Sequence, residues 1–157
     1  MRDTANEKTR LIRMMLVGDR DPDEIISDTV DGVDVPYLVR WWVKQKTESE
    51  QPSEENIYLH LFLRSDYDRA LHDHPFDSTS IILQGSYREH LADGKVRVLS
   101  EGDIVTRKAE DAHRIELIND EPVWSLFIRG PKVREWGFLC PDGWTHWTQF
   151  IASRCES

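Results

Sequence analysis

Three histidines have the residue type and spacing of metal ligands. His72 and His74 stand two positions apart in the run His-Asp-His-Pro-Phe. In an extended strand, residues two positions apart project from the same face. His113 lies on a later predicted strand, which could bring a third imidazole to the same point. Because neutral imidazole is a common ligand of zinc, iron, nickel and copper, the pattern predicts a metal site inside a β-barrel.

Two glycines frame these histidines at separations that match a known family. Gly85 follows the His-x-His pair and Gly102 precedes His113, as in the two short motifs of the cupin superfamily. The chain resembles this superfamily over residues 57–130, and in particular its small single-domain bacterial members. The resemblance implies an all-β, cupin-like double-stranded β-helix (jelly roll), an architecture whose two sheets protect their strand edges.

The chain departs from the cupin pattern at the glutamate ligand, where Ser78 stands. A serine hydroxyl is a poor ligand beside a carboxylate, so the metal shell is expected to be three histidines plus water or substrate. Glu89, on the next predicted strand, is an alternative source of a carboxylate. Open coordination positions are typical of catalytic metals and not of structural zinc. The expected cofactor is a divalent ion, with Fe(II) favoured and Zn, Ni or Mn as alternatives.

Tyr87 and Glu89 are candidate catalytic residues because they share one face of the strand that follows Gly85. The alternation with Ile82 and Leu91 predicts that this face lines the barrel interior. In an apolar interior the pKa of Glu89 would rise, so that its carboxyl group could transfer protons. The Tyr87 phenol could donate a proton or a hydrogen bond to substrate. The structural alternative is that Glu89 pairs with an arginine across the sheet or reaches solvent.

Three further polar residues each have a functional and a structural interpretation. Arg129 ends a predicted strand and could bind a carboxylate, including that of 2-oxoglutarate; otherwise it is an exposed strand-end arginine. Asp73 could orient an imidazole N–H, or it is a solvated or turn-capping aspartate. His60 is either a hydrogen-bonded core or rim residue of its strand or part of the pocket.

The segments that must position these residues are predicted mainly as strands. Residues 11–16 form the apolar cluster of a helix that stops at Gly18, and Asp21-Pro22 is typical of the start of a second, short helix over 22–27. Short strands with turn signals between them follow, which is typical of an antiparallel sandwich or barrel. One cupin domain is therefore predicted over 1–157, with helices over 4–28, a barrel over 35–130 and an aromatic coil over 131–157.

Composition argues against several classes of partner. The net charge of -9, from 29 acidic and 20 basic residues, argues against nucleic acid as the main partner. The N-terminus lacks the apolar region of a signal peptide, and no run approaches the length of a membrane helix, so no membrane partner is expected. Cys140 and Cys155 form no CxxC pair and are predicted to be free thiols. A soluble, cytoplasmic protein follows.

The predicted function is that of a metal-dependent enzyme acting on a small polar metabolite. Mononuclear Fe(II) dioxygenase chemistry is favoured over isomerase or lyase chemistry, by analogy with other three-histidine cupins. The alternative is a non-enzymatic cupin, a ligand-binding or sensing module with a structural metal or none. The strand predicted over 37–44 is a candidate sheet edge, through which the chain could form a homodimer.

Overall fold

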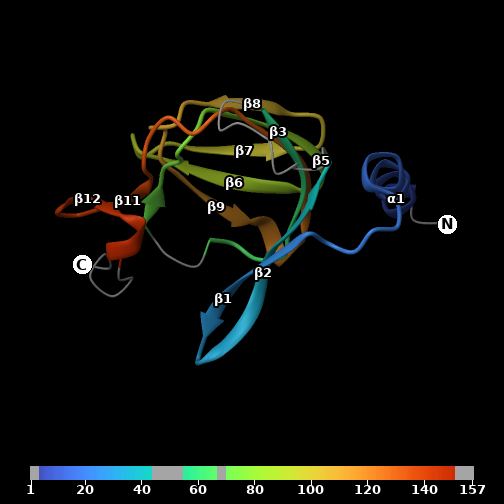
Figure 1. Cartoon of the computed structure of the whole chain (residues 1–157), viewed down its shortest axis with the longest axis horizontal. Coiled ribbons are helices and arrows are strands. Elements are labelled where there is room, and N and C mark those ends of the chain that lie inside the picture. Colours follow the sequence, from blue (N-terminus) through green and yellow to red (C-terminus); the bar gives the residue numbers. More distant parts are fainter. Residues whose placement is uncertain (1–3, 44–54, 67–69, 151–157) are drawn as a thin grey trace.

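The computed structural model describes residues 4–43, 55–66 and 70–150 of the chain, which form one helix-covered pair of antiparallel sheets (Figure 1). The first sheet has the order β1-β2-β3-β10-β5-β8. Its strands are Glu24–Val30, Val33–Trp42, Asn56–Phe62, Val123–Arg129, Ser78–Gln84 and Ile104–Arg107. The second sheet has the order β12-β11-β4-β9-β6-β7. Its strands are Gly143–His146, Gly137–Cys140, Leu71–His72, His113–Leu117, Ser86–Leu91 and Val96–Ser100. The predicted all-β architecture is confirmed.

The main core lies between the two sheets, because alternate residues of each strand point inward. In β5 the buried residues are Ser78, Ser80 and Ile82, and in β6 they are Tyr87 and Glu89. The inner apolar cluster is contributed by both sheets and comprises Leu38, Phe62, Ile82, Tyr87, Leu99, Val105, Ile115, Leu117 and Val123. The same inner face therefore carries both the core and the polar residues of the site.

Helix α1 (Thr4–Val17) covers the outer face of the first sheet, where Val17 packs in one cluster with Val39, Trp41 and Leu59. The helix ends where Gly18 was expected to stop it. Gly18 has φ +65°, and its N–H donates to the Met14 carbonyl oxygen at 3.1 Å. Left-handed glycine is a common way to end a helix, since it has no Cβ to clash.

The second helix predicted over 22–27 is wrong. Strand β1 occupies this segment and pairs with β2 in a hairpin that extends away from the sheets (Figure 1). Asp31 and Gly32 turn the chain with φ values of 50° and 79°. An Asp-Gly pair with both φ values positive is typical of a two-residue hairpin turn. The helix-start signal at Asp21-Pro22 was thus overridden by β-branched residues and a turn that lay ten residues beyond it.

The aromatic coil predicted over 131–157 is also wrong in part. Strands β11 and β12 form a hairpin, and β11 pairs with β4, so that Phe138 lies opposite His72. The short 3-10 helix Trp147–Gln149 follows. Cys140 is disulfide-bonded and is not the free thiol predicted; Cys155 lies outside the described residues. The sheet that carries the histidines is thus extended by a segment that showed no strand periodicity.

Strand β2 is not a sheet edge, because β1 pairs along it and β3 pairs on its other side. Lys44, the last residue of the predicted edge strand, lies outside the described residues. In the part of the chain that the structure describes, no helix has the length and apolar character needed to cross a membrane.

Candidate metal centre

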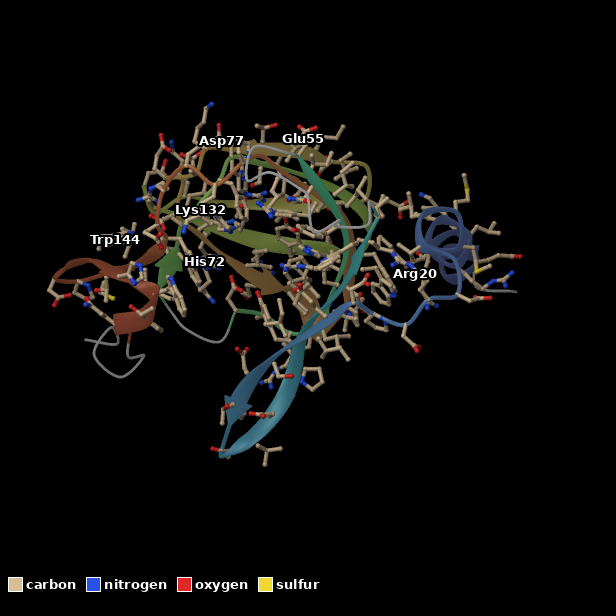
Figure 2. All side chains as sticks on the ribbon, in the orientation of Figure 1. Arg20, Glu55, His72, Asp77, Lys132 and Trp144 are labelled. Carbon is tan, nitrogen blue, oxygen red and sulfur yellow. The ribbon has the colours of Figure 1, made fainter. Side chains whose placement is uncertain are left out.

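The structure brings the three predicted ligands together. His72 ends β4 and lies in register opposite His113, the first residue of β9, while His74 lies just past the end of β4. The ring centroids are 5.1 Å apart for His72 and His74, 4.9 Å for His72 and His113, and 5.0 Å for His74 and His113. One ligand atom from each ring lies within 4.8 Å of the others. Figure 2 shows His72 where β4 meets the C-terminal hairpin.

The surroundings of His72 and His74 favour the neutral ring, which is the form that binds metal. Burial lowers the pKa of His72 to about 4, although the nearby Asp66 carboxylate acts in the opposite direction. Burial and the neighbouring His72 and His113 hold the pKa of His74 well below its ordinary value. The Nδ1 atom of His74 is buried and has no hydrogen-bond partner. Three converging imidazoles, two of them with lowered pKa values and one with an unpartnered buried nitrogen, fit a divalent cation.

A cavity of about 450 Å³ lies between the sheets and includes the triad in its lining. The first sheet contributes Arg40, His60 and Phe127 to its wall, and Tyr87 faces them from the second sheet. Phe76 and Trp136 line it from the loops. The volume suits a small organic molecule.

Comparison with known proteins fixes the architecture. No protein-family model matches the chain, and no curated protein matches its sequence. Many solved structures are similar, including the following three. The cupin-2 domain Rru_A2000 from Rhodospirillum rubrum has a TM-score of 0.58 at 13% identity, over 79% of this chain and 80% of that one. KdgF from Halomonas sp. has a TM-score of 0.53 at 19% identity, over 74% of this chain and 93% of that one. FeII HppE has a TM-score of 0.52 at 18% identity, over 70% of this chain and 58% of that one. The chain has the cupin fold.

At these identities the similarity establishes the fold alone, and the chemistry must be argued from the residues of this chain. The match spans little more than half of the FeII HppE chain. The predicted double-stranded β-helix is confirmed, and the His-x-His pair with His113 occupies the interior as the resemblance implied.

Glu89 fixes the orientation of His113. Its carboxylate is fully buried, and Oε1 accepts a hydrogen bond from His113 Nδ1 at 2.5 Å. An ionised carboxylate can only accept, so Nδ1 carries the proton and Nε2 keeps the lone pair that a metal requires. Arg107 Nε donates to Oε1 and Arg97 Nε to Oε2, each at 2.5 Å. Both carboxylate oxygens are thus occupied, which disfavours Glu89 as the missing metal ligand.

The raised pKa expected for Glu89 is wrong. Burial does raise it, but the hydrogen bond from His113 and the charge of Arg107 outweigh burial and hold the pKa far below its ordinary range. The structural alternative, an arginine across the sheet, is what the structure shows: Arg97 lies opposite Glu89 on β7. The lowered pKa of Glu89 could not be predicted from the sequence, because Arg107 comes from the other sheet.

Tyr87 shares the inner face with Glu89, as the alternation predicted. Its side chain is buried, and its hydroxyl oxygen accepts a hydrogen bond from Arg107 Nη2 at 3.2 Å. Burial raises the pKa of Tyr87, and the charge of Arg107 only partly offsets this. The phenol lines the cavity that contains the triad. Its catalytic role remains a prediction.

Ser78 and Arg129 lie outside the lining of the cavity. The Ser78 hydroxyl is buried without a partner at the start of β5. Arg129 Nε donates to the Tyr58 hydroxyl at 3.0 Å, and its guanidinium lies 5.0 Å from the centroid of the Phe76 ring. The structure does not bring Arg129 to the triad, so its binding of a 2-oxoglutarate carboxylate is not favoured by this placement.

Asp73 neither orients an imidazole nor lies in solvent. Its buried carboxylate accepts hydrogen bonds from Arg134 Nη1 at 2.6 Å, from the Gly137 N–H at 2.8 Å and from Trp144 Nε1 at 2.9 Å. All three donors belong to residues 134–144. Asp73 therefore anchors the C-terminal hairpin beside the two histidines that flank it.

Asp73→Ala should detach this hairpin and destabilise the protein by about 2–4 kcal/mol, because the partly exposed Arg134 guanidinium and two neutral donors lose their buried acceptor. The measurement is the free energy of unfolding in denaturant. The control is Asp77→Ala in the same loop, whose carboxylate is half-exposed and pairs with Lys108, so its loss should be smaller. Equal losses in the two variants would contradict the anchoring role.

The metal-free protein should lose stability as the pH falls from 6.5 toward about 4. In the unfolded chain His72 takes up a proton near 6.5, whereas in the folded protein its lowered pKa prevents this until about 4. Protonation between these values therefore favours unfolding. Denaturant melts across this range should show a smaller pH dependence in His72→Gln. A profile as steep in the variant as in the wild type would contradict the assignment.

Proposed function

We propose that this protein is a metal-dependent cupin enzyme in which His72, His74 and His113 hold a mononuclear divalent ion, with Fe(II) favoured over Zn, Ni or Mn. The observation that carries the proposal is the convergence of three imidazoles beside a cavity of about 450 Å³. The presence of FeII HppE among the similar structures supports iron. When bound, the ion supplies Lewis acidity or, for iron, redox capacity.

The protein residues would position the substrate and hold its protons. Three histidines without a carboxylate ligand leave room for a substrate oxygen, as expected of a catalytic site. The Tyr87 hydroxyl is fixed by Arg107 and lines the cavity, so it is placed to donate a hydrogen bond to a substrate oxygen. Glu89 would keep the His113 proton on Nδ1. We propose dioxygenase chemistry on a small polar metabolite, ahead of isomerase or lyase chemistry.

A non-enzymatic ligand-binding or sensing module is the second candidate. The complete pairing of Glu89 favours it, because neither carboxylate oxygen is free to act as a base. In that case the metal would be structural or absent. A cytoplasmic location and a homodimer also remain proposals.

Metal analysis of protein purified without chelators separates the two candidates. If the protein is an enzyme, we expect one redox-active ion per chain. We also expect oxygen consumption when a metabolite panel is added to the iron-loaded protein. If the protein is a non-enzymatic module, we expect tightly bound zinc without an exchangeable water, or no metal. A protein that takes up no divalent ion would overturn the enzyme proposal.

A further inference from the structure

We propose that the wall opposite the histidine triad holds a carboxylate-binding subsite, in which Arg40 binds the anionic end of a substrate whose flat apolar body lies against Phe127 and Phe76. The inference deepens the proposed function, since it names the class of substrate that the same cavity would accept. The triad lies on or just beyond β4 and β9 of the second sheet, whereas Arg40 lies on β2 of the first. The two ends of a substrate would thus meet different sheets.

One guanidinium nitrogen of Arg40, Nη2, is available to donate to a ligand. Its Nε donates to His60 Nε2 at 2.9 Å, and its Nη1 donates to Glu24 Oε2 at 2.9 Å. Its guanidinium carbon lies 4.7 Å from the centroid of the Tyr58 ring. Among the described residues, none accepts a hydrogen bond from Nη2. Because the other two nitrogens and the ring face hold the group in place, a ligand would meet a donor that is already oriented.

His60 holds Arg40 in a single arrangement. Its ring is buried, and burial together with the Arg40 charge keeps its pKa well below the ordinary value. A neutral ring that accepts from Arg40 at Nε2 must carry its proton on Nδ1. That Nδ1 is buried and has no partner. An unsatisfied buried donor is costly, and His60 itself is one of the residues that line the cavity.

The charges of the lining favour an anion. Apart from the histidines, the basic and acidic residues of the lining are Arg40, Arg107 and Asp73. Asp73 is bound by Arg134, and Arg107 is bound by Glu89. Glu24, the carboxylate partner of Arg40, lies outside the lining. A ligand at this wall therefore meets the Arg40 guanidinium, whose ion-pair partner Glu24 lies outside the lining, and no unpaired carboxylate of the lining.

The rings between the two walls favour a flat apolar body. Phe127 stacks on His60 with centroids 5.1 Å apart, Phe76 meets Phe127 edge-on at 6.1 Å, and His74 lies 6.0 Å from Phe76. The two phenylalanines are only partly buried and line the cavity, so ring surface is open to a ligand. The row of rings runs from the Arg40 subsite to the triad. Offset or edge contacts with such rings favour an aromatic or otherwise planar group.

Binding of benzoate, benzamide and acetate to the metal-free protein tests the proposal by calorimetry. Benzoate should bind more tightly than benzamide, which lacks the charge, and than acetate, which lacks the ring. Arg40→Gln should weaken benzoate binding about tenfold or more and leave benzamide nearly unchanged, because only the anion loses a charge-assisted hydrogen bond. Arg129→Gln is the matched comparison, since that guanidinium also lies within 5.9 Å of the Tyr58 ring centroid.

The outcomes are distinct. Loss of benzoate binding in Arg129→Gln but not in Arg40→Gln would overturn the proposal and place the anion site at Arg129. Equal binding of benzoate and benzamide would also overturn it. If Arg40→Gln fails to fold, the Arg40 Nε–H signal in the NMR spectrum of the wild type should shift on titration with benzoate, and an unchanged signal would count against the subsite. Because no metal is present, these results do not depend on whether the triad binds an ion.

Discussion

His113→Ala should abolish stoichiometric metal binding while leaving most of the β structure intact. The variant removes one of three imidazoles whose ligand atoms lie within 4.8 Å of one another, so the remaining pair cannot complete the site. Loss of one ligand should lower the affinity for a divalent ion by about 100-fold or more. Mutation of a residue that only hydrogen-bonds to a ligand already lowers metal affinity by about 10–100-fold. Metal content after dialysis and far-UV circular dichroism measure the two parts of this prediction.

The control for this variant is His90→Ala. His90 lies on β6, the neighbour of β9, and its Nε2 lies 2.7 Å from Glu116 Oε2 at the partly exposed surface. It contributes nothing to the triad, so its variant should keep a full complement of metal. Stoichiometric metal in His113→Ala would refute the ligand assignment, and loss of metal from both variants would point to a general effect on folding.

The triad could be predicted from sequence because its information is local. His72 and His74 share a short extended segment, and the spacing from Gly102 to His113 places the third ligand on a strand. The inward direction of Tyr87 and Glu89 followed from simple alternation, and the burial of both residues agrees with it. One strand and its period were sufficient for Tyr87 and Glu89 and for the His72 and His74 pair, whereas His113 was assigned through the cupin-like spacing from Gly102.

The partners of these residues could not be predicted, because they arrive from distant strands. Arg107 reaches Glu89 from the other sheet, and this reverses the direction of the expected pKa shift. Arg40 meets His60 across 20 positions of sequence, so the candidate anion subsite had no local signal. Burial alone predicts a raised carboxyl pKa, and only the folded structure shows which cations share that burial.

The two errors of secondary structure had different causes. The β1–β2 hairpin could have been found, because Asp31-Gly32 between β-branched segments is a strong hairpin signal. In the C-terminal hairpin the turn signal Pro141-Asp142-Gly143 was present, but β11 and β12 lack clear alternation and are held by Asp73 from a distant loop. Tertiary contacts override weak local preference at such positions.

Glu89→Gln should destabilise the protein by about 3–5 kcal/mol, because it leaves the buried Arg107 and the half-exposed Arg97 without their anionic partner. It should also lower metal affinity by about 10–100-fold, since the glutamine amide no longer fixes the proton on His113 Nδ1 with a charged acceptor. Denaturant unfolding and metal competition measure the two effects. Glu116→Gln on the adjacent strand is the control; its carboxylate pairs with Arg88 at the surface, so its effect should stay within about 1 kcal/mol.

The pH dependence of the same pair of variants shows whether the charge of Glu89 is the cause. The pKa of Glu89 is lowered on folding, so its contribution is fully present above its ordinary value of 4.5 and is lost as the pH falls below it. The wild type should therefore lose its advantage over Glu89→Gln in acid, whereas above 4.5 the difference should be constant. A stability gap that persists unchanged in acid would mean that packing at this position, and not the buried charge, holds His113 and the arginines in place.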